Sequence, residues 1–117
     1  MIREQRLDPV VHYLEVEGAE VISELEKRMD AALSDGVRWL IVDLEHAQLG
    51  RALEAPLAAI DRSLRERGGE LILVSTAPAV ADAVARYEQA ARPAVAASLD
   101  QALTILKLLR PKTAVQP

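Results

Sequence analysis

Two short apolar runs, each placed soon after the end of a helical pattern, constrain the fold of this chain most strongly. The first run is Trp39–Leu44 and the second is Leu71–Val74. Apolar runs of this length, the first apolar except for Asp43 at its acidic end, are typical of strands that are covered on both faces, as in parallel sheets. Glycines precede both runs, at Gly36 and at Gly68 and Gly69, where helices commonly end. The pattern therefore predicts an α/β protein built on a parallel sheet.

The rest of the chain continues this alternation. Strands are expected at 2–7 and 10–16, and the turn signal between them predicts a hairpin at the sheet edge. Helices are expected where apolar residues recur at helical spacing: at 22–33, at about 53–67, after Thr76 as a cap with Val80, Val84 and Tyr87 inward, and after the capping box Ser98–Gln101 with Leu99, Leu103 and Leu106 inward. A short strand is expected at 95–97. This order predicts right-handed crossovers between mostly parallel strands.

Composition excludes several classes of protein. The chain has 117 residues, half of them apolar and 3% aromatic, which predicts one domain with an aliphatic core. A net charge of −4 argues against non-specific nucleic-acid binding and against binding to anionic membranes. The absence of cysteine excludes disulfides and thiolate chemistry. With no signal-peptide pattern at Met1–Arg6 and no span-length apolar segment, a cytoplasmic protein without membrane insertion is expected.

Three segments carry motifs that occur together in one known family. The first runs from Leu25 through the Asp35–Gly36 turn to the strand at 41–44. The second runs from Leu64 through the double glycine to Val74, and the third comprises 77–80 with 98–103. In this order they resemble the STAS domain of anti-sigma factor antagonists. The resemblance implies an α/β, STAS-like fold: a small mixed, mostly parallel β-sheet with about four α-helices largely on one face, formed by residues 1–109 as a single domain, with a flexible tail at 110–117.

The resemblance also implies a function in protein binding rather than catalysis. The best-known members bind a histidine-kinase-like anti-sigma factor, and phosphorylation of a loop serine after the central strand switches that binding. A phosphate there adds nearly two negative charges and a desolvation cost to the interface. By resemblance we expect a non-catalytic protein of bacterial signalling that regulates transcription through a protein partner, with no cofactor and no nucleic acid. A homodimer is left open.

The loop after Asp43 departs from the family at that serine. Counting forward from Asp43 places the serine at Ala52, and counting back from Gly68 places it at Arg51, and neither residue has a hydroxyl. The glycine that follows in the family is replaced by Leu53 or Ala52. The passage from Gly18 to the first helix is also shorter than is usual in the family. The resemblance therefore predicts a partner-binding loop without the usual phosphorylation switch, formed by Leu49, Gly50, Arg51, Ala52, Leu53 and Glu54.

Two features near this loop each have a sharper and a plainer interpretation. Glu54 is either a fixed mimic of the phosphorylated state or, as we favour, an acidic residue stabilised by the helix dipole and offset by Arg51. Ser75 and Thr76 follow the next strand at the same edge of the sheet. They are either a relocated phosphorylation site or, as we favour, a turn residue and a helix cap.

Other polar residues do not form a recognisable catalytic or metal site. Asp43, Glu45 and His46 lie together in sequence but lack further ligands, so no metal is expected, and Asp43 is interpreted as a strand terminus. His12 alternates within a strand and is interpreted as structural or exposed. No nucleophile has an adjacent base and no glycine-rich loop is present, which argues against an enzyme. A solvated helix face is expected for Arg62, Arg65 and Arg67.

Two further functional hypotheses stay open from the sequence. One is an accessory STAS subunit of a larger complex, such as a lipid-transport ABC complex or a stress-signalling scaffold. The other is a small-ligand or nucleotide-binding module, which predicts a thermal shift with GTP or ATP. Identification of the proteins that co-purify with the chain discriminates the first hypothesis from the anti-sigma factor antagonist.

Overall fold

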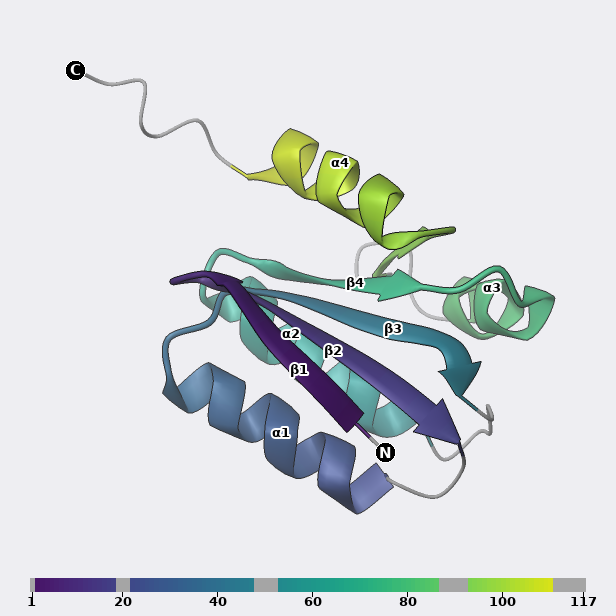
Figure 1. The fold of residues 1–117 in the computed structure, drawn as a ribbon, viewed down its shortest axis with the longest axis horizontal. Coiled ribbons are helices and arrows are strands. Elements are labelled where there is room, and N and C mark those ends of the chain that lie inside the picture. Colours follow the sequence, from purple (N-terminus) through teal and green to yellow (C-terminus); the bar gives the residue numbers. More distant parts are fainter. Residues whose placement is uncertain (1, 19–21, 48–52, 87–92, 111–117) are drawn as a thin grey trace.

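A computed structural model of the chain describes residues 2–18, 22–47, 53–86 and 93–110, which form one five-stranded sheet with four helices (Figure 1). The strands are β1 (Ile2–Asp8), β2 (Val11–Gly18), β3 (Trp39–Ala47), β4 (Glu70–Val74) and β5 (Ala94–Ala96). The helices are α1 (Ile22–Ser34), α2 (Glu54–Glu66), α3 (Pro78–Ala85) and α4 (Leu99–Leu109). The observed order of elements is the predicted one.

The sheet is mixed and mostly parallel, as predicted. Its strands lie in the order β1-β2-β3-β4-β5; β1 is antiparallel to β2, and the other three pairings are parallel. The backbone N–H of Val10 donates to Asp8 Oδ1 at 2.8 Å and closes the turn between β1 and β2. The predicted hairpin at the sheet edge is therefore confirmed.

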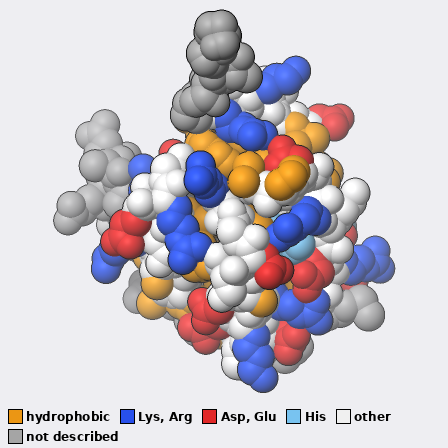
Figure 2. All heavy atoms as spheres, turned by 90° about the vertical axis from the view of Figure 1, so that its left-hand side faces the viewer, with side chains coloured by type: hydrophobic (Ala, Val, Ile, Leu, Met, Phe, Trp, Pro, Cys, Tyr) orange, Lys and Arg blue, Asp and Glu red, His pale blue; other side chains and the backbone are white. Residues whose placement is uncertain are grey.

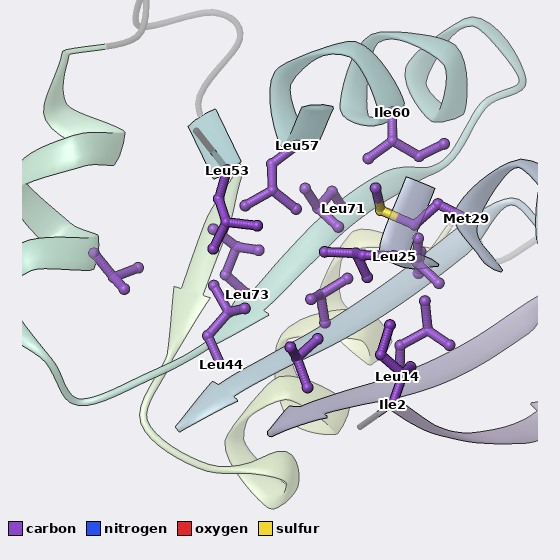
Figure 3. Close-up of a cluster of buried hydrophobic side chains, with 14 of the residues drawn as sticks. Ile2, Leu14, Leu25, Met29, Leu44, Leu53, Leu57, Ile60, Leu71 and Leu73 are labelled. Atoms are coloured by element: carbon purple, nitrogen blue, oxygen red, sulfur yellow. The ribbon is translucent and has the colours of Figure 1, made fainter. Parts of the chain in front are cut away.

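Three helices cover one face of the sheet. Alternate residues of β3, Leu40, Val42 and Leu44, contribute to a buried cluster with side chains from α1 and α2 (Figure 3). Leu57, Ile60 and Leu64 of α2 are buried there, as their helical spacing predicts. Val80 and Val84 of α3 belong to the same cluster. This arrangement agrees with the expectation that the helices lie largely on one face.

The fourth helix covers the other face. Trp39 and Ile41 of β3 point into a second cluster, which Ala102 and Leu106 of α4 complete. Both faces of β3 are thus buried along its first part, which explains why Trp39–Val42 is apolar without interruption. Among the described residues, no helix has the length and apolar character needed to cross a membrane.

The two glycines between α2 and β4 serve different purposes. Gly68 has a φ of +85°, a conformation that favours glycine and ends the helix. A Cβ atom on Gly69 would lie 1.6 Å from the carbonyl oxygen of Arg38, so only glycine allows this close approach. The double glycine is therefore required both for the turn and for the packing of β4 beside the start of β3.

Three local expectations are wrong. Leu103 is 36% exposed rather than inward, because α4 directs Ala102 and Leu106 toward the sheet, and position 103 lies off that face. Thr76 does not cap α3, whose N-cap is Ala77 without a side-chain hydrogen bond. Asp43 is not a strand terminus, because β3 continues to Ala47 through pairing with the end of β2.

Two expectations concern residues that lie outside the described part of the chain. They are the inward position of Tyr87 and the proposed tail apart from its first residue. That residue, Arg110, donates from Nη1 to Asp8 Oδ2 at 2.9 Å and so connects the end of α4 to the β1–β2 turn.

Candidate functional site

The candidate site lies at the carboxyl edge of the parallel strands, where β3 and β4 end and α2 and α3 begin. This edge is the usual position of a site in an open α/β sheet. Within the predicted partner loop, Leu49, Gly50, Arg51 and Ala52 lie outside the described residues, whereas Leu53 and Glu54 are described. The described part of the site consists of the elements that flank the loop.

Leu53 anchors the start of α2. Its side chain is 8% exposed and points into the cluster between the sheet and the helices (Figure 3). As the N-cap it supplies no side-chain hydrogen bond, so packing rather than capping positions this end of the helix. Pro56 follows in the first helical turn, where proline is tolerated.

Glu54 forms an ion pair across the site. Arg86, which follows α3, donates from Nη2 to Glu54 Oε2 at 2.5 Å. The sequence pointed to Arg51 as the residue that offsets this charge; Arg51 lies outside the described residues, and Arg86, far along the chain, is a partner of Glu54 among the residues that the structure describes. A carboxylate in the first turn of α2 also interacts favourably with the helix dipole. Glu54 thus connects the beginning of α2 to the end of α3.

Glu45 connects the end of β3 to the segment before α3. Its carboxylate accepts hydrogen bonds from the Thr76 backbone N–H at 2.8 Å and from Thr76 Oγ1 at 2.6 Å. These bonds, the side-chain bond first, lower the pKa of Glu45 below its usual value. Sequence reasoning missed this contact because Glu45 lies on β3 whereas Thr76 follows the neighbouring strand β4, about thirty residues along the chain. The contact explains why the Thr76 hydroxyl is not a helix cap.

Ser75 holds the turn that follows β4. Its side chain is buried, with Oγ accepting the backbone N–H of Ala77 at 3.0 Å, and its own N–H donates to Ala96 O at 2.8 Å. The hydroxyls of Ser75 and Thr76 are therefore both engaged in the structure. Phosphorylation at either residue stays an untested hypothesis, and it would require these contacts to break.

Asp43 has a structural role on the opposite face of the sheet from α2. Tyr13 donates its hydroxyl to Asp43 Oδ2 at 2.7 Å, and the Glu45 N–H donates to Oδ1 at 2.9 Å. Burial and, next, the bond to Asp43 raise the pKa of Tyr13 above its usual value.

Among residues 2–18, 22–47, 53–86 and 93–110, no group of three His, Asp or Glu side chains is arranged to hold a metal ion.

His12 is structural, as one of its two interpretations expected. Its Nε2 lies 3.0 Å from Glu4 Oε1, and its side chain is 12% exposed. Glu4 also accepts a hydrogen bond from Arg28 of α1. The cluster of His12, Glu4 and Arg28 therefore connects α1 to the edge hairpin of β1 and β2, and it lies away from the candidate site.

The expected arginine face of α2 is only partly solvated. Arg65 lies 2.8 Å from Asp61 and 3.5 Å from Glu70, and Arg67 donates to the carbonyl oxygen of Leu33. Arg62 is exposed. The expectation is therefore wrong for Arg65, which is partly buried against acceptors on α2 and β4, whereas Arg67 is exposed as expected.

A groove between α1 and α2 opens beside the candidate loop. Its volume is about 420 Å³. The α2 wall contains Pro56, Ala59 and Ser63, and the α1 wall includes Glu26 and Asp30. Because Pro56 lies in the first turn of α2, the groove reaches the beginning of that helix.

The order of the strands, the single edge hairpin and the distribution of helices define this chain as an α/β domain with the STAS fold. Neither a protein-family model nor a curated protein matches the sequence significantly. Solved structures match it closely: an anti-sigma factor antagonist from Mycobacterium paratuberculosis superimposes with a TM-score of 0.77 at 23% identity, covering 92% of this chain and 93% of that one.

Two further matches are of the same kind. The anti-sigma factor antagonist SpoIIAA in its unphosphorylated form has a TM-score of 0.75 at 12% identity, covering 92% of this chain and 98% of that chain. The Bacillus cell fate determinant SpoIIAA in the phosphorylated form has a TM-score of 0.72 at 11% identity, covering 90% and 99%. At these identities the shared property is the fold, and the predicted STAS-like fold is confirmed.

Proposed function

We propose that this chain is a non-catalytic, cytoplasmic STAS-type protein that acts by binding a protein partner, like an anti-sigma factor antagonist in bacterial signalling. The partner is an anti-sigma factor of the histidine-kinase-like type, and the output is regulation of transcription. The observation that carries this proposal is the likeness of fold to anti-sigma factor antagonists over 92% of the chain. Among the described residues, no group of three His, Asp or Glu side chains could hold a metal ion, so no metal site points to a different function.

The partner surface consists of the loop Leu49–Glu54 and the exposed face of α2 with its groove. Ala55 and Ala59 are exposed on α2, and their small side chains allow a partner backbone to approach closely. On the facing wall the two acids Glu26 and Asp30 outnumber the one base, Lys27, which favours a partner segment with basic side chains. Leu53 and the ion pair of Glu54 with Arg86 hold the start of α2 in place under this surface.

An arginine at position 59 tests the surface directly. Ala59→Arg places a long charged side chain in the groove, and we expect the affinity for the anti-sigma factor to fall by about thirtyfold, or about 2 kcal/mol. Thr104→Arg, at an exposed position of α4 on the other face of the sheet, is the matched control and keeps wild-type affinity. Titration calorimetry with the purified anti-sigma factor measures both variants. Equal affinities for Ala59→Arg and wild type would contradict the proposed surface.

The same protein pair tests the missing switch. Because Arg51 and Ala52 have no hydroxyl, incubation with the kinase-like partner and ATP is expected to leave the chain without phosphate, as mass spectrometry measures. Ser75 and Thr76 are the alternative acceptors, and their hydroxyls are engaged with Ala77 N and Glu45. Phosphate found on either residue would establish the relocated site and overturn the proposal of an unswitched protein.

Purification of the chain from its native cells identifies the context. Recovery of a histidine-kinase-like anti-sigma factor supports the proposed function. Recovery of a transporter ATPase or of a large signalling scaffold would establish an accessory subunit in its place. A thermal shift with millimolar GTP or ATP would indicate a nucleotide-binding module.

A further inference from the structure

The outer edge of β1 is available for pairing with another strand. β1 is the first strand in the order of the sheet and pairs through one side only, with β2 (Figure 1). Its other side presents backbone N–H and C=O groups that no described strand uses. Such an edge is a template for a further strand, and many proteins protect it with a proline, a bulge or a very short strand.

The two edges of the sheet differ in how they are protected. The edge strand β5 has three residues, whereas β1 has seven and contains no proline. The irregularity in β1 lies between Arg6 and Asp8, at the end of the strand. The residues from Arg3 to Arg6 therefore pair regularly with β2. Arg3 to Arg6 are all exposed. The edge of β1 is thus long and accessible, and its protection against pairing consists of the charged side chains of Arg3, Glu4 and Arg6.

The charges along β1 complement a second copy of the same strand. In an antiparallel pair centred on Gln5, Glu4 of each copy lies directly opposite Arg6 of the other. Arg3 lies opposite Leu7, and its aliphatic stem covers that apolar side chain. Directly opposite residues share a face of the sheet, so both Glu4–Arg6 pairs form at contact distance, and such pairs stabilise a sheet. Shifting the axis by half a residue toward Glu4 sets Arg3 opposite Arg6, and shifting it toward Arg6 sets Glu4 opposite Leu7, so neither shift keeps the two Glu4–Arg6 pairs.

We infer that a second copy of this chain binds at the β1 edge, joining two sheets into one with a two-fold axis at Gln5. Arg6 is free to contribute, because its contact with Asp35 is long at 3.8 Å and exposed on both sides. Glu4 is already held in place by Arg28 and His12, so it loses little freedom when it accepts Arg6. Figure 2, which views the molecule from the left-hand side of Figure 1, shows basic and acidic side chains interspersed on that side.

This self-association leaves the candidate partner surface accessible. The surface comprises the loop Leu49–Glu54, the exposed face of α2 and the groove between α1 and α2, whereas the new backbone pairing is made by β1. The inference goes beyond the proposed function, since the assembly would present two partner surfaces whatever protein binds there.

A cysteine at the axis tests the register. The chain has no cysteine, so Gln5→Cys introduces a single thiol, and only a two-fold axis at position 5 places it opposite itself. Arg3→Cys is the matched control on the same face of β1, and its thiol lies opposite Leu7 of the other copy. Under mild oxidation we expect Gln5→Cys to cross-link about tenfold faster than Arg3→Cys. Equal rates for the two variants, or faster cross-linking of Arg3→Cys, would overturn the register.

Charge reversal tests the same contact without a covalent bond. Arg6→Glu and Glu4→Arg each replace both opposite-charge pairs by like-charge pairs, and each is expected to weaken self-association by about tenfold or more. A mixture of the two variants restores every pair and is expected to form the mixed dimer, as sedimentation measures. Circular dichroism verifies that each variant is folded. Failure of the folded variants to associate when mixed, or a monomeric wild type at high concentration, would overturn the inference.

Discussion

At the scale of the residue, Asp61 illustrates a role that only the folded chain reveals. Its carboxylate is 1% exposed, accepts the Leu71 N–H at 2.9 Å and lies 2.8 Å from Arg65 Nε. The sequence places Asp61 next to the apolar residue Ile60 on α2, where a charge is unexpected. The buried carboxylate is stabilised because two groups donate hydrogen bonds to it, the Leu71 N–H of β4 and Arg65 of α2.

Substitution of Asp61 by alanine is expected to destabilise the protein by about 3 kcal/mol, because a buried backbone donor and a cation both lose their acceptor. Asp61→Asn retains an oxygen for the Leu71 N–H and is expected to cost less. Urea denaturation followed by the fluorescence of Trp39, which is buried, measures both. Equal losses for the two variants would show that the charge of Asp61, rather than its hydrogen bond to β4, dominates.

At the scale of the element, Glu45 orders the segment between β4 and α3. The segment contains few residues, and its position relative to β3 depends on the two hydrogen bonds that Thr76 donates to Glu45. Since the bonds favour the ionised carboxylate, the folded state has the lower pKa. The contact therefore stabilises the fold fully above the unfolded pKa, near 4.5, and is lost as the pH falls through the folded pKa.

Glu45→Gln is accordingly expected to lower the thermal midpoint at pH 7, where the carboxylate is ionised. The difference between wild type and variant is expected to shrink below pH 4.5 as wild-type Glu45 takes up a proton. Thermal melts at closely spaced pH values measure it. A constant difference between pH 7 and pH 3 would indicate that shape rather than charge at position 45 matters.

At the scale of the whole molecule, two buried clusters share one sheet. Leu40 and Val42 belong to the cluster under α1 to α3. Trp39 and Ile41, which alternate with them along β3, belong to the cluster under α4. Loss of either cluster exposes one face of β3, so the two are expected to unfold together. This coupling supports the proposal that residues 1–109 form a single domain.

Leu57→Ala and Leu106→Ala remove one buried leucine from each cluster and are each expected to cost about 2–5 kcal/mol. In both variants, calorimetry is expected to show one transition at a lower temperature, with the same midpoint when followed by Trp39 fluorescence. A separate early transition in Leu106→Ala would show instead that α4 detaches as an independent unit.

Much of the fold was predictable from local patterns, whereas the contacts of the site were not. Trp39–Leu44 and the double glycine predict a buried strand and a helix end because each depends on residues adjacent in sequence. The pairing of Glu54 with Arg86 and of Glu45 with Thr76 depends on how α2, α3 and β4 are placed in space. The partners are about thirty residues apart, a separation at which no sequence period applies.

The sequence by itself determined the order of the elements, the parallel sheet and the absence of a hydroxyl at Arg51 and Ala52. These properties follow from hydrophobic period, turn residues and side-chain chemistry, which are local. Only the tertiary structure decided that β3 extends to Ala47, that Leu103 faces outward and that no described strand pairs with the outer edge of β1. Each of these depends on which surfaces neighbouring elements cover, and burial and pairing are properties of the assembled sheet rather than of any one segment.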